Sequence, residues 1–330
     1  MNLILLSFIV GFVVALVLAP LIIKFAKKAK ASQTILHYVE SHAGKSGTPT
    51  MGGIIFILPI LFVPFIFFGE NFQLGLIAIV VTLAYGVLGF LDDFIKVKFK
   101  QNRGLRAYQK IVGQFGIAVL LAIFVYTSPM IGTTLYIPFT MLSFDIGIFI
   151  IPLIILTFIA ITNAANLTDG LDGLAGGVSF VAVAAFSAVI LIVAASPSFP
   201  GGELSAEYSN LATVGAVGAG AILAFLMFNW HPAKIFMGDT GSLALGGLIA
   251  CLAVFSLQTL LLPIICITFV LSAVSVSMQV LYFKKTKKRI FLMAPIHHHF
   301  EKKGVHETKI AAIYIIATIL VSVLVIAVLL

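Results

Sequence analysis

The chain has 330 residues, of which 61% are hydrophobic and only 10% are charged, and its mean hydropathy is +1.18. A soluble domain has about a quarter charged residues, so this composition excludes a water-soluble globular protein and indicates an integral membrane protein. The net charge of +8 lies in short segments between apolar stretches. Membrane topology explains this charge, so no nucleic acid is expected as a partner.

A helix needs about 20 apolar residues to cross the core of a bilayer, and ten apolar stretches of the chain are about this long. We therefore predict an all-α polytopic membrane protein with about ten transmembrane helices, forming one domain over residues 1–330. Between two of these stretches, the connection 128–145 could form a small hairpin. The predicted spans are about 2–23, 52–69, 74–95, 111–127, 146–162, 174–195, 208–228, 242–258, 261–283 and 309–329.

All 20 Lys and Arg residues fall on one side of this arrangement, whereas the opposite connections, including 196–207, carry only acidic charges. Cytoplasmic loops of membrane proteins carry an excess of basic residues. The basic side is therefore predicted to be cytoplasmic and both termini extracytoplasmic, which requires an even number of spans. The cytoplasmic loops expected to form the active site are about 24–51, 96–110, 163–173, 229–241 and 284–308.

All seven histidines and eight of the twelve acidic residues also lie on the cytoplasmic side. Ionisable groups next to a membrane are costly, so such a concentration indicates a functional site. The competing interpretation is structural pairing of these groups with nearby lysines.

The first motif is the segment Gly44–Gly53, just before the second predicted span. A phosphate-binding P-loop is excluded, because its pattern requires a glycine where this chain has Val39. Lys45 could contact a phosphate in a flexible loop, and Gly52 with Gly53 would allow close helix approach. A plain turn before a helix is the alternative.

The second motif is the acidic pair Asp92 and Asp93, at the cytoplasmic end of the third span. Adjacent carboxylates on a helix point about 100° apart and need not share one partner. The pair suggests a divalent cation, a general base, or both. Alternatively, Lys96 and Lys98 neutralise it from one turn further on.

The third motif, residues 163–173, contains Asp169 and Asp172, which would share one face of a helix. Gly170 and Gly173 favour instead a loop whose backbone amides approach a ligand. The alternating oxygen ligands and closing glutamate of an EF-hand are absent.

The fourth motif is the segment Phe228–Ser242. There Asp239 stands among small residues, as in a metal or phosphate site at the start of a helix.

The fifth motif is the run His297, His298 and His299. Three neighbouring histidines cannot all bind one zinc without distortion, so we favour histidine donors to an anionic substrate over a zinc site. The preceding stretch Lys287–Met293 is basic and then apolar, which predicts a short interfacial helix.

At these motifs the sequence resembles the polyprenyl-phosphate N-acetylhexosamine-1-phosphate transferases, and within them the phospho-N-acetylmuramoyl-pentapeptide transferase family. The resemblance covers nearly the whole chain, with matching motif order and topology. The segments 47–53 and 297–301 separate this family from relatives that use smaller UDP-sugars. The segment 303–309 departs from the Gly-Trp-Pro-Glu type of continuation typical of the family.

The resemblance implies a bacterial plasma-membrane enzyme that transfers phospho-N-acetylmuramoyl-pentapeptide from UDP-MurNAc-pentapeptide to undecaprenyl phosphate, giving lipid I and UMP. It also implies Mg²⁺ as the cofactor, contact with membrane lipid, and a homodimer. Mg²⁺ would neutralise the diphosphate and act as a Lewis acid, held by acidic ligands.

The resemblance also implies roles for individual residues. Asp239 is the expected metal ligand, and Asp92 is expected to activate the lipid phosphate, with Asp93 supporting either role. A covalent route with an aspartate nucleophile stays open. Phe236 could stack on the uracil, and Lys45 and Lys110 could contact phosphates. The full set of expected substrate-binding residues is Lys45, Lys110, Asn166, Asp169, Asp172, Asn229, Phe236, Gly238, His297, His298 and His299.

Two alternatives stand beside this interpretation. One is a related transferase that moves a GlcNAc-1-phosphate. The other is a lipid transporter, because polar residues in membrane helices often line pathways. The acidic residues gather on one side of the membrane rather than at its midplane, which favours the enzyme.

Overall fold

The computed structural model describes residues 2–29, 47–99, 104–140, 142–196 and 203–330. Within them nine helices are long and apolar enough to cross a membrane, which confirms the predicted all-α polytopic fold. A tenth apolar helical segment, Ile54–Ile66, is shorter and lies at the second predicted span. The helices are α1 (Asn2–Lys28), α2 (Ile54–Phe62), α3 (Gln73–Lys98), α4 (Ala107–Thr127), α5 (Ile150–Thr168), α6 (Leu174–Ala195), α7 (Glu203–Asn229), α8 (Gly238–Phe255), α9 (Leu262–Ile265), α10 (Ile267–Thr286), α11 (Ile296–Lys302) and α12 (Glu307–Leu329).

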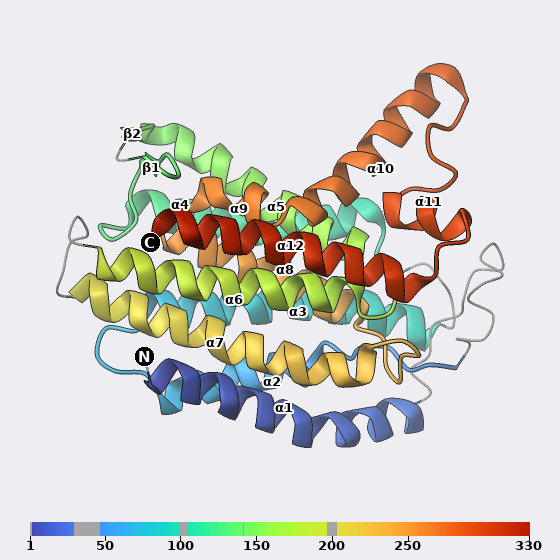
Figure 1. Cartoon of the computed structure of the whole chain (residues 1–330), viewed down its shortest axis with the longest axis horizontal. Helices are drawn as coiled ribbons and strands as arrows, with labels where there is room; N and C mark the ends of the chain where they lie inside the picture. Colours follow the sequence, from blue (N-terminus) through green and yellow to red (C-terminus); the bar gives the residue numbers. More distant parts are fainter. Residues whose placement is uncertain (1, 30–46, 100–103, 141, 197–202) are drawn as a thin grey trace.

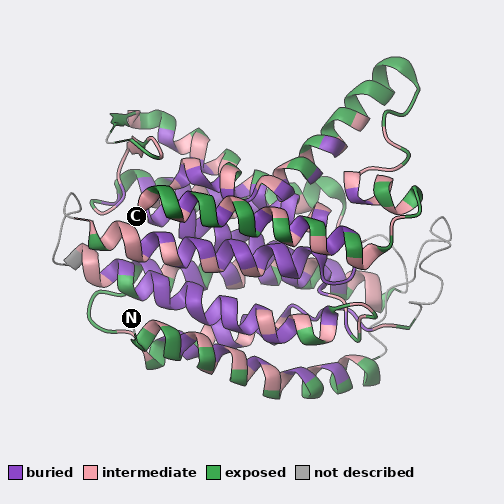
Figure 2. Cartoon of the chain, in the orientation of Figure 1, coloured by how far each residue is buried: buried purple, intermediate pink, exposed green. Residues whose placement is uncertain are grey.

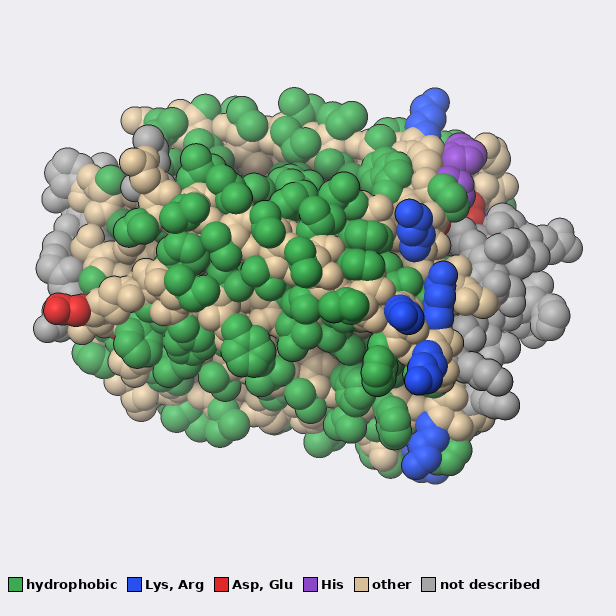
Figure 3. Space-filling view, turned by 90° about the horizontal axis from the view of Figure 1, so that it is seen from below, with side chains coloured by type: hydrophobic (Ala, Val, Ile, Leu, Met, Phe, Trp, Pro, Cys, Tyr) green, Lys and Arg blue, Asp and Glu red, His purple; other side chains and the backbone are tan. Residues whose placement is uncertain are grey.

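The long helices run side by side, and α10 leaves the bundle at an angle (Figure 1). Both chain ends lie at one end of the bundle (Figure 1). On the face seen in Figure 3, the Lys and Arg side chains form a band at one end, beside a wide belt of hydrophobic side chains. This separation agrees with the charge asymmetry from which the topology was predicted.

Helix α8 forms the centre of the core. Its sequence is rich in Gly, Leu and Ala, and nearly all of its residues are buried. It packs against α3, α5 and α6. Burial is greatest in α8 and α7 and much lower in α1 and α12, as Figure 2 shows. The outer surface instead exposes large apolar side chains such as Leu5, Val17, Phe62, Leu120 and Leu324. An exposed apolar belt of this kind suits contact with lipid.

Helices α1 and α7 approach closely because glycines face each other's backbones. A Cβ atom on Gly220 would lie 2.1 Å from the carbonyl oxygen of Phe8, and one on Gly11 would lie 2.6 Å from that of Val217. Small residues at helix contacts allow this backbone approach in membranes, where packing rather than the hydrophobic effect drives association.

A buried carboxylate fixes the outer end of α3. Glu207 was expected in the outer connection, but α7 begins at Glu203, so Glu207 lies inside that helix. Its carboxylate accepts hydrogen bonds from the backbone N–H groups of Gln73 at 2.9 Å and Leu74 at 2.7 Å. These N–H groups at the start of α3 have no partner within the helix, so α7 caps α3.

The expected hairpin within 128–145 is confirmed. Strands β1 (Thr134–Tyr136) and β2 (Ser143–Asp145) pair antiparallel, with Thr134 opposite Asp145. The short helix predicted at Lys287–Met293 is wrong, because this stretch is irregular and the next helix, α11, begins at Ile296. The pattern of basic and apolar residues there was too short to require helical periodicity.

The ninth predicted span, 261–283, starts too early. A single 3-10 turn (Thr259–Leu261) and the one-turn helix α9 come first, and the long helix α10 begins only at Ile267. Pro263 lies at the start of α9, where a missing N–H group is tolerated.

Candidate functional site

Two aspartates near the end of α3 meet a third at the start of α8. The helices cross at Gly89, where a Cβ atom would lie 2.0 Å from the carbonyl oxygen of Asp239. With no side chain between them, the backbone of α8 rests directly on α3. Carboxylate oxygens of Asp92, Asp93 and Asp239 consequently all lie within 4.8 Å of one another.

Asp93 anchors the first turn of α8. It is fully buried, and its Oδ2 accepts hydrogen bonds from the backbone N–H of Thr240 at 2.9 Å and from its hydroxyl at 2.7 Å. Gly238 just before has a φ of +73°, and a Cβ atom there would lie 2.4 Å from Asp93 Oδ2. Glycine at 238 is thus required by backbone conformation and by space.

Two lysines surround the carboxylates. Lys96 Nζ lies 2.5 Å from Asp92 Oδ2, 3.1 Å from Asp239 Oδ2 and 3.7 Å from Asp93 Oδ1. Lys110 Nζ, from the first turn of α4, lies 2.8 Å from Asp239 Oδ2. The pairing that we considered for Lys96 therefore exists. Lys98 contacts the rings of neighbouring phenylalanines instead.

Asn166, near the end of α5, joins the same cluster. Its Nδ2 donates hydrogen bonds to Asp239 Oδ1 at 2.8 Å and to Ser242 Oγ at 2.9 Å, while its Oδ1 accepts one from Lys110 Nζ at 3.3 Å. Helices α3, α4, α5 and α8 thus bring expected catalytic and substrate-binding residues to one place.

The donor set of this cluster suits a hard divalent cation. Mg²⁺ prefers oxygen ligands, and three carboxylates are available here. Among the described residues, Asp93 Oδ1 is buried without a hydrogen-bond donor, and the Lys96 ammonium at 3.7 Å is too distant to donate one. A buried oxygen without a hydrogen-bond donor is costly, and a bound cation would stabilise it, so this oxygen fits a cation site.

The loop that includes Gly47–Gly53 lies along the segment before α8. The backbone N–H of Phe236 donates to the carbonyl of Pro49 at 2.8 Å, and the N–H of Gly52 donates to the carbonyl of Phe236 at 2.8 Å. Phe236 is half-buried, so part of its ring faces outward. Lys45, which we expected to contact a phosphate, lies outside the described residues.

The histidine helix α11 covers the loop that follows α5. A Cβ atom on Gly170 would lie 2.6 Å from His297 Nε2 and 2.7 Å from His298 Nε2. Burial, helped by the charge of His298, lowers the pKa of His297 to about 3, so this ring is neutral. Desolvation, together with the charge of Asp239, raises the pKa of Asp169 to about 8.

The three neighbouring histidines have different surroundings. Neither ring nitrogen of buried His297 has a hydrogen-bond partner in the described part of the chain. His298 Nδ1 lies 2.8 Å from Glu301 Oε2, and His299 Nδ1 accepts a hydrogen bond from the N–H of Leu292 at 3.1 Å. His297 and His298 thus reach the Gly170 loop, whereas His299 holds the segment before α11.

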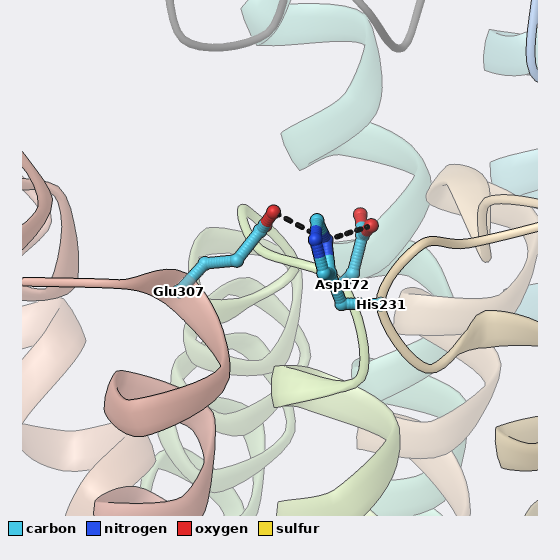
Figure 4. Close-up of side chains that lie close together, drawn as sticks. All are labelled: Asp172, His231 and Glu307. Carbon is cyan, nitrogen blue, oxygen red and sulfur yellow. Dashed lines mark hydrogen bonds and ion pairs between the residues drawn. The ribbon is translucent and has the colours of Figure 1, made fainter.

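A second cluster joins three segments distant in the sequence. His231 Nδ1 lies between Asp172 Oδ2 at 3.3 Å and Glu307 Oε1 at 2.5 Å (Figure 4). Asp172 Oδ2 also accepts from the N–H of Ala233 at 3.0 Å. The ring of His306 packs edge-on against His231, with centroids 5.3 Å apart. This cluster ties the loops after α5 and α7 to the start of α12.

Asn229 braces these loops. Its Oδ1 accepts a hydrogen bond from the N–H of Gly173 at 3.1 Å, and its Nδ2 donates one to the carbonyl of Ile235 at 3.0 Å. The side chain is buried, so the structure gives it a supporting position between two loops. Its expected contact with the substrate stays a prediction.

Several residues of the site escaped the sequence interpretation. Thr240 and Ser242 lie inside the fourth motif, but the sequence did not indicate their partners. In the structure Thr240 donates hydrogen bonds to Asp93, and Ser242 accepts one from Asn166. His231 also lay in a motif, yet its partner Glu307 belongs to a segment that departs from the family pattern. Lys96 was considered only as a neutralising charge, although its spacing from both acids of α3 was a usable signal.

Comparisons with known proteins agree with this geometry. The sequence profile described as Glycosyl transferase family 4 matches residues 75–257, and phospho-N-acetylmuramoyl-pentapeptide-transferase signature 1 matches residues 45–57. A phospho-N-acetylmuramoyl-pentapeptide-transferase of Halalkalibacterium halodurans is 43% identical over 95% of this chain and 93% of its own length. Proteins of the same name from Clostridium kluyveri and Clostridioides difficile are 44% and 41% identical, over 95% of this chain and 95% and 94% of their own lengths. The chain therefore belongs to the phospho-N-acetylmuramoyl-pentapeptide-transferase family.

Proposed function

We propose that this protein transfers phospho-N-acetylmuramoyl-pentapeptide from UDP-MurNAc-pentapeptide to undecaprenyl phosphate, releasing UMP and forming lipid I for peptidoglycan synthesis. The observation that carries the proposal is the meeting of Asp92, Asp93 and Asp239 with Lys96 and Lys110 at the basic end of the bundle. Carboxylates for a divalent cation and ammonium groups for phosphates are what diphosphate chemistry requires.

In this reaction an oxygen of the lipid phosphate attacks the sugar-linked phosphorus, and the bond from that phosphorus to the oxygen of UMP breaks. Mg²⁺ held by Asp239 and its carboxylate neighbours would neutralise the diphosphate and act as a Lewis acid. Lys110, fixed by Asp239 and Asn166, is placed to orient a phosphate. These residues bind and orient the diphosphate.

Asp92 is our candidate for activating the lipid phosphate. Its Oδ1 accepts a hydrogen bond from the N–H of Leu105 at 2.9 Å, and its Oδ2 pairs with Lys96. This fixed carboxylate could take the remaining proton from a phosphate monoanion, which would make the attacking oxygen more nucleophilic. A covalent route in which Asp92 itself attacks is the second possibility.

An apolar cavity offers a place for part of the polyprenyl tail. It has a volume of about 320 Å³ and lies between α5, α9 and α10, lined by residues that include Leu156, Leu262 and Val270. Its lining also includes Ala164, two residues before the Asn166 that contacts Asp239. The apolar lining of this cavity matches the apolar chemistry of the tail.

Purified protein should release UMP from UDP-MurNAc-pentapeptide when undecaprenyl phosphate is present, and much more slowly from UDP-GlcNAc. Faster turnover of UDP-GlcNAc would favour the related GlcNAc-1-phosphate transferase. Absence of UMP release with both nucleotides would favour a transporter. In the same proposal the protein is a homodimer, which light scattering of the detergent-solubilised protein would test.

The proposal also assigns the site to the cytoplasmic side of the bacterial plasma membrane. The charge distribution supports it, because the Lys and Arg side chains on the face seen in Figure 3 gather at one end of the bundle, and two lysines, Lys96 and Lys110, contact Asp239. A soluble nucleotide substrate made inside the cell would reach the site from that side.

A further inference from the structure

The position of Lys96 among the carboxylates is unusual for a neutralising lysine. An exposed ion pair commonly joins one lysine to one acid and contributes little. Here a single ammonium contacts three aspartates, at 2.5 Å from Asp92, 3.1 Å from Asp239 and 3.7 Å from Asp93, and the side chain is 17% exposed. Lys96 thus occupies the point at which a cation shared by the three carboxylates would lie.

Both oxygens of Asp239 already accept hydrogen bonds from donors of the protein. Its Oδ2 faces Lys96 at 3.1 Å and Lys110 at 2.8 Å, and its Oδ1 accepts from Asn166 at 2.8 Å. Mg²⁺ binds carboxylate oxygens at about 2.0–2.1 Å. An ammonium that stays near Oδ2 would be repelled by the double positive charge of a metal at the same oxygen, so metal binding there favours the departure of one of the two lysines.

Lys96 is the donor that can leave. Lys110 contacts only one carboxylate of the cluster and is held by Asn166 Oδ1 as well. The two lysines have equally flexible stems and similar exposure, but only Lys96 lies near all three carboxylates, at the position that a shared metal would take. Once displaced, its ammonium stays beside the site and needs a new anionic partner.

We propose that Lys96 is an exchangeable internal cation. It holds Asp92, Asp93 and Asp239 together when no metal is bound, and it moves to the diphosphate of the nucleotide substrate when a divalent cation takes its place. This inference rests on the proposed function, because it assumes the metal and the diphosphate. Lys96 then couples the binding of the metal to the binding of the nucleotide. The metal displaces Lys96 toward the diphosphate, and the diphosphate draws Lys96 away from the carboxylates that bind the metal.

The coupling can be measured without turnover. Mn²⁺ binding to the full-length protein in detergent would be followed by electron paramagnetic resonance, with and without UDP-MurNAc-pentapeptide, and with undecaprenyl phosphate withheld. The test variant is Lys96→Met. The control is Lys98→Met, which removes an exposed lysine of the same helix that contacts the rings of Phe94 and Phe99.

Without nucleotide, Lys96→Met is expected to bind Mn²⁺ roughly tenfold or more tightly than the wild type, because the competing charge is gone. The nucleotide should tighten Mn²⁺ binding to the wild type and to Lys98→Met by about fivefold or more, and by a clearly smaller factor in Lys96→Met, where only the direct attraction between the metal and the diphosphate remains. The rise in Tm on adding Mn²⁺ should likewise be larger for Lys96→Met. If Lys96→Met does not fold, Lys96→Gln replaces it, because glutamine keeps a hydrogen-bond donor. The same changes in Mn²⁺ binding and Tm are expected for Lys96→Gln.

Unchanged or weaker Mn²⁺ binding by the Lys96 variants, beside normal binding by the wild type, overturns the exchange and leaves the proposed metal site intact. If the Lys96 variants bind Mn²⁺ more tightly than the wild type, but the nucleotide tightens their Mn²⁺ binding as much as it does in the wild type, Lys96 does not move to the diphosphate. Failure of the wild type to bind Mn²⁺ with or without nucleotide contradicts the proposed metal site itself, and the exchange with it.

Discussion

Replacing Gly89 by alanine would separate α3 from α8 at the point where the site is built. The added Cβ atom would lie 2.0 Å from the carbonyl oxygen of Asp239, 2.4 Å from its carbonyl carbon and 2.6 Å from the nitrogen of Thr240. These neighbours are backbone atoms of a buried helix, so no side chain can rotate away. The helices themselves must move.

The size of the effect follows from these distances. Unbonded carbon atoms in contact lie about 3.5–4.0 Å apart, so α8 must shift by roughly 1 Å or more relative to α3. Overpacking of this kind costs about 1–3 kcal/mol. A displacement of about 1 Å in reacting groups can lower a rate ~100-fold. We expect Gly89→Ala to lower Tm and to reduce transfer about 100-fold, because Asp239 moves away from Asp92 and Asp93.

The matched control is Gly116→Ala in α4. Gly116 is exposed, and a Cβ atom there would meet no atom within 4 Å. Since alanine favours a helix over glycine by about 1 kcal/mol, this variant should keep its activity, and its Tm should be equal to or higher than that of the wild type. Both variants would be compared by UMP release and by thermal unfolding in detergent. Equal activity and Tm in the two variants would refute the close crossing as the basis of the site.

Three further predictions follow from the site and the topology. Asp92→Asn should lower kcat with little change in the nucleotide KM, and the loss should shrink above about pH 6, where a phosphate monoester becomes a dianion without a base; a loss that is constant with pH contradicts the base role. The folded-state pKa of Asp169 is raised to about 8. The carboxyl group of an unfolded Asp has a pKa of about 3.9. Between that pH and about 8, the folded protein keeps a proton that the unfolded chain has lost, so the wild type loses stability as pH rises. The Tm of Asp169→Asn relative to the wild type should therefore rise from pH 5 to pH 8, and a constant difference would contradict the raised pKa. A cysteine placed at Leu330 in a cysteine-free background should react with an impermeant reagent in intact cells, whereas protection there with labelling in the basic loops would reverse the topology.

The fold was largely predictable because lipid imposes a simple pattern on sequence. Apolar stretches and one-sided basic loops located the membrane helices and the common side of both termini. The errors lie where hydropathy does not distinguish helix from turn, as at Thr259–Ile265 before α10 and at Lys287–Met293. Glu207 was placed in the connection 196–207 because the seventh span was predicted to begin at residue 208, but it lies inside α7, where the open N–H groups of α3 stabilise its carboxylate.

The sequence singled out individual residues of the candidate site, but it did not predict how they are arranged. Asp92 and Asp239 stood out as acids next to apolar helices, and the family resemblance suggested their roles. Their contact depends on the helix crossing at Gly89, which no spacing within one motif specifies. The joining of His231 to Glu307 likewise depends on how α12 meets the loop after α7.

The central claim is that Asp239 and its carboxylate neighbours form a metal-dependent transfer site. Its most direct test is UMP release by purified wild type and Asp239→Asn across a Mg²⁺ titration, with both substrates present. Asparagine keeps the size and hydrogen-bonding capacity of the side chain and removes the charge that would hold the metal. We expect Asp239→Asn to stay folded, with a Tm near that of the wild type, and to transfer nothing at any Mg²⁺ concentration. Wild-type rates from Asp239→Asn at ordinary Mg²⁺ concentration would contradict it.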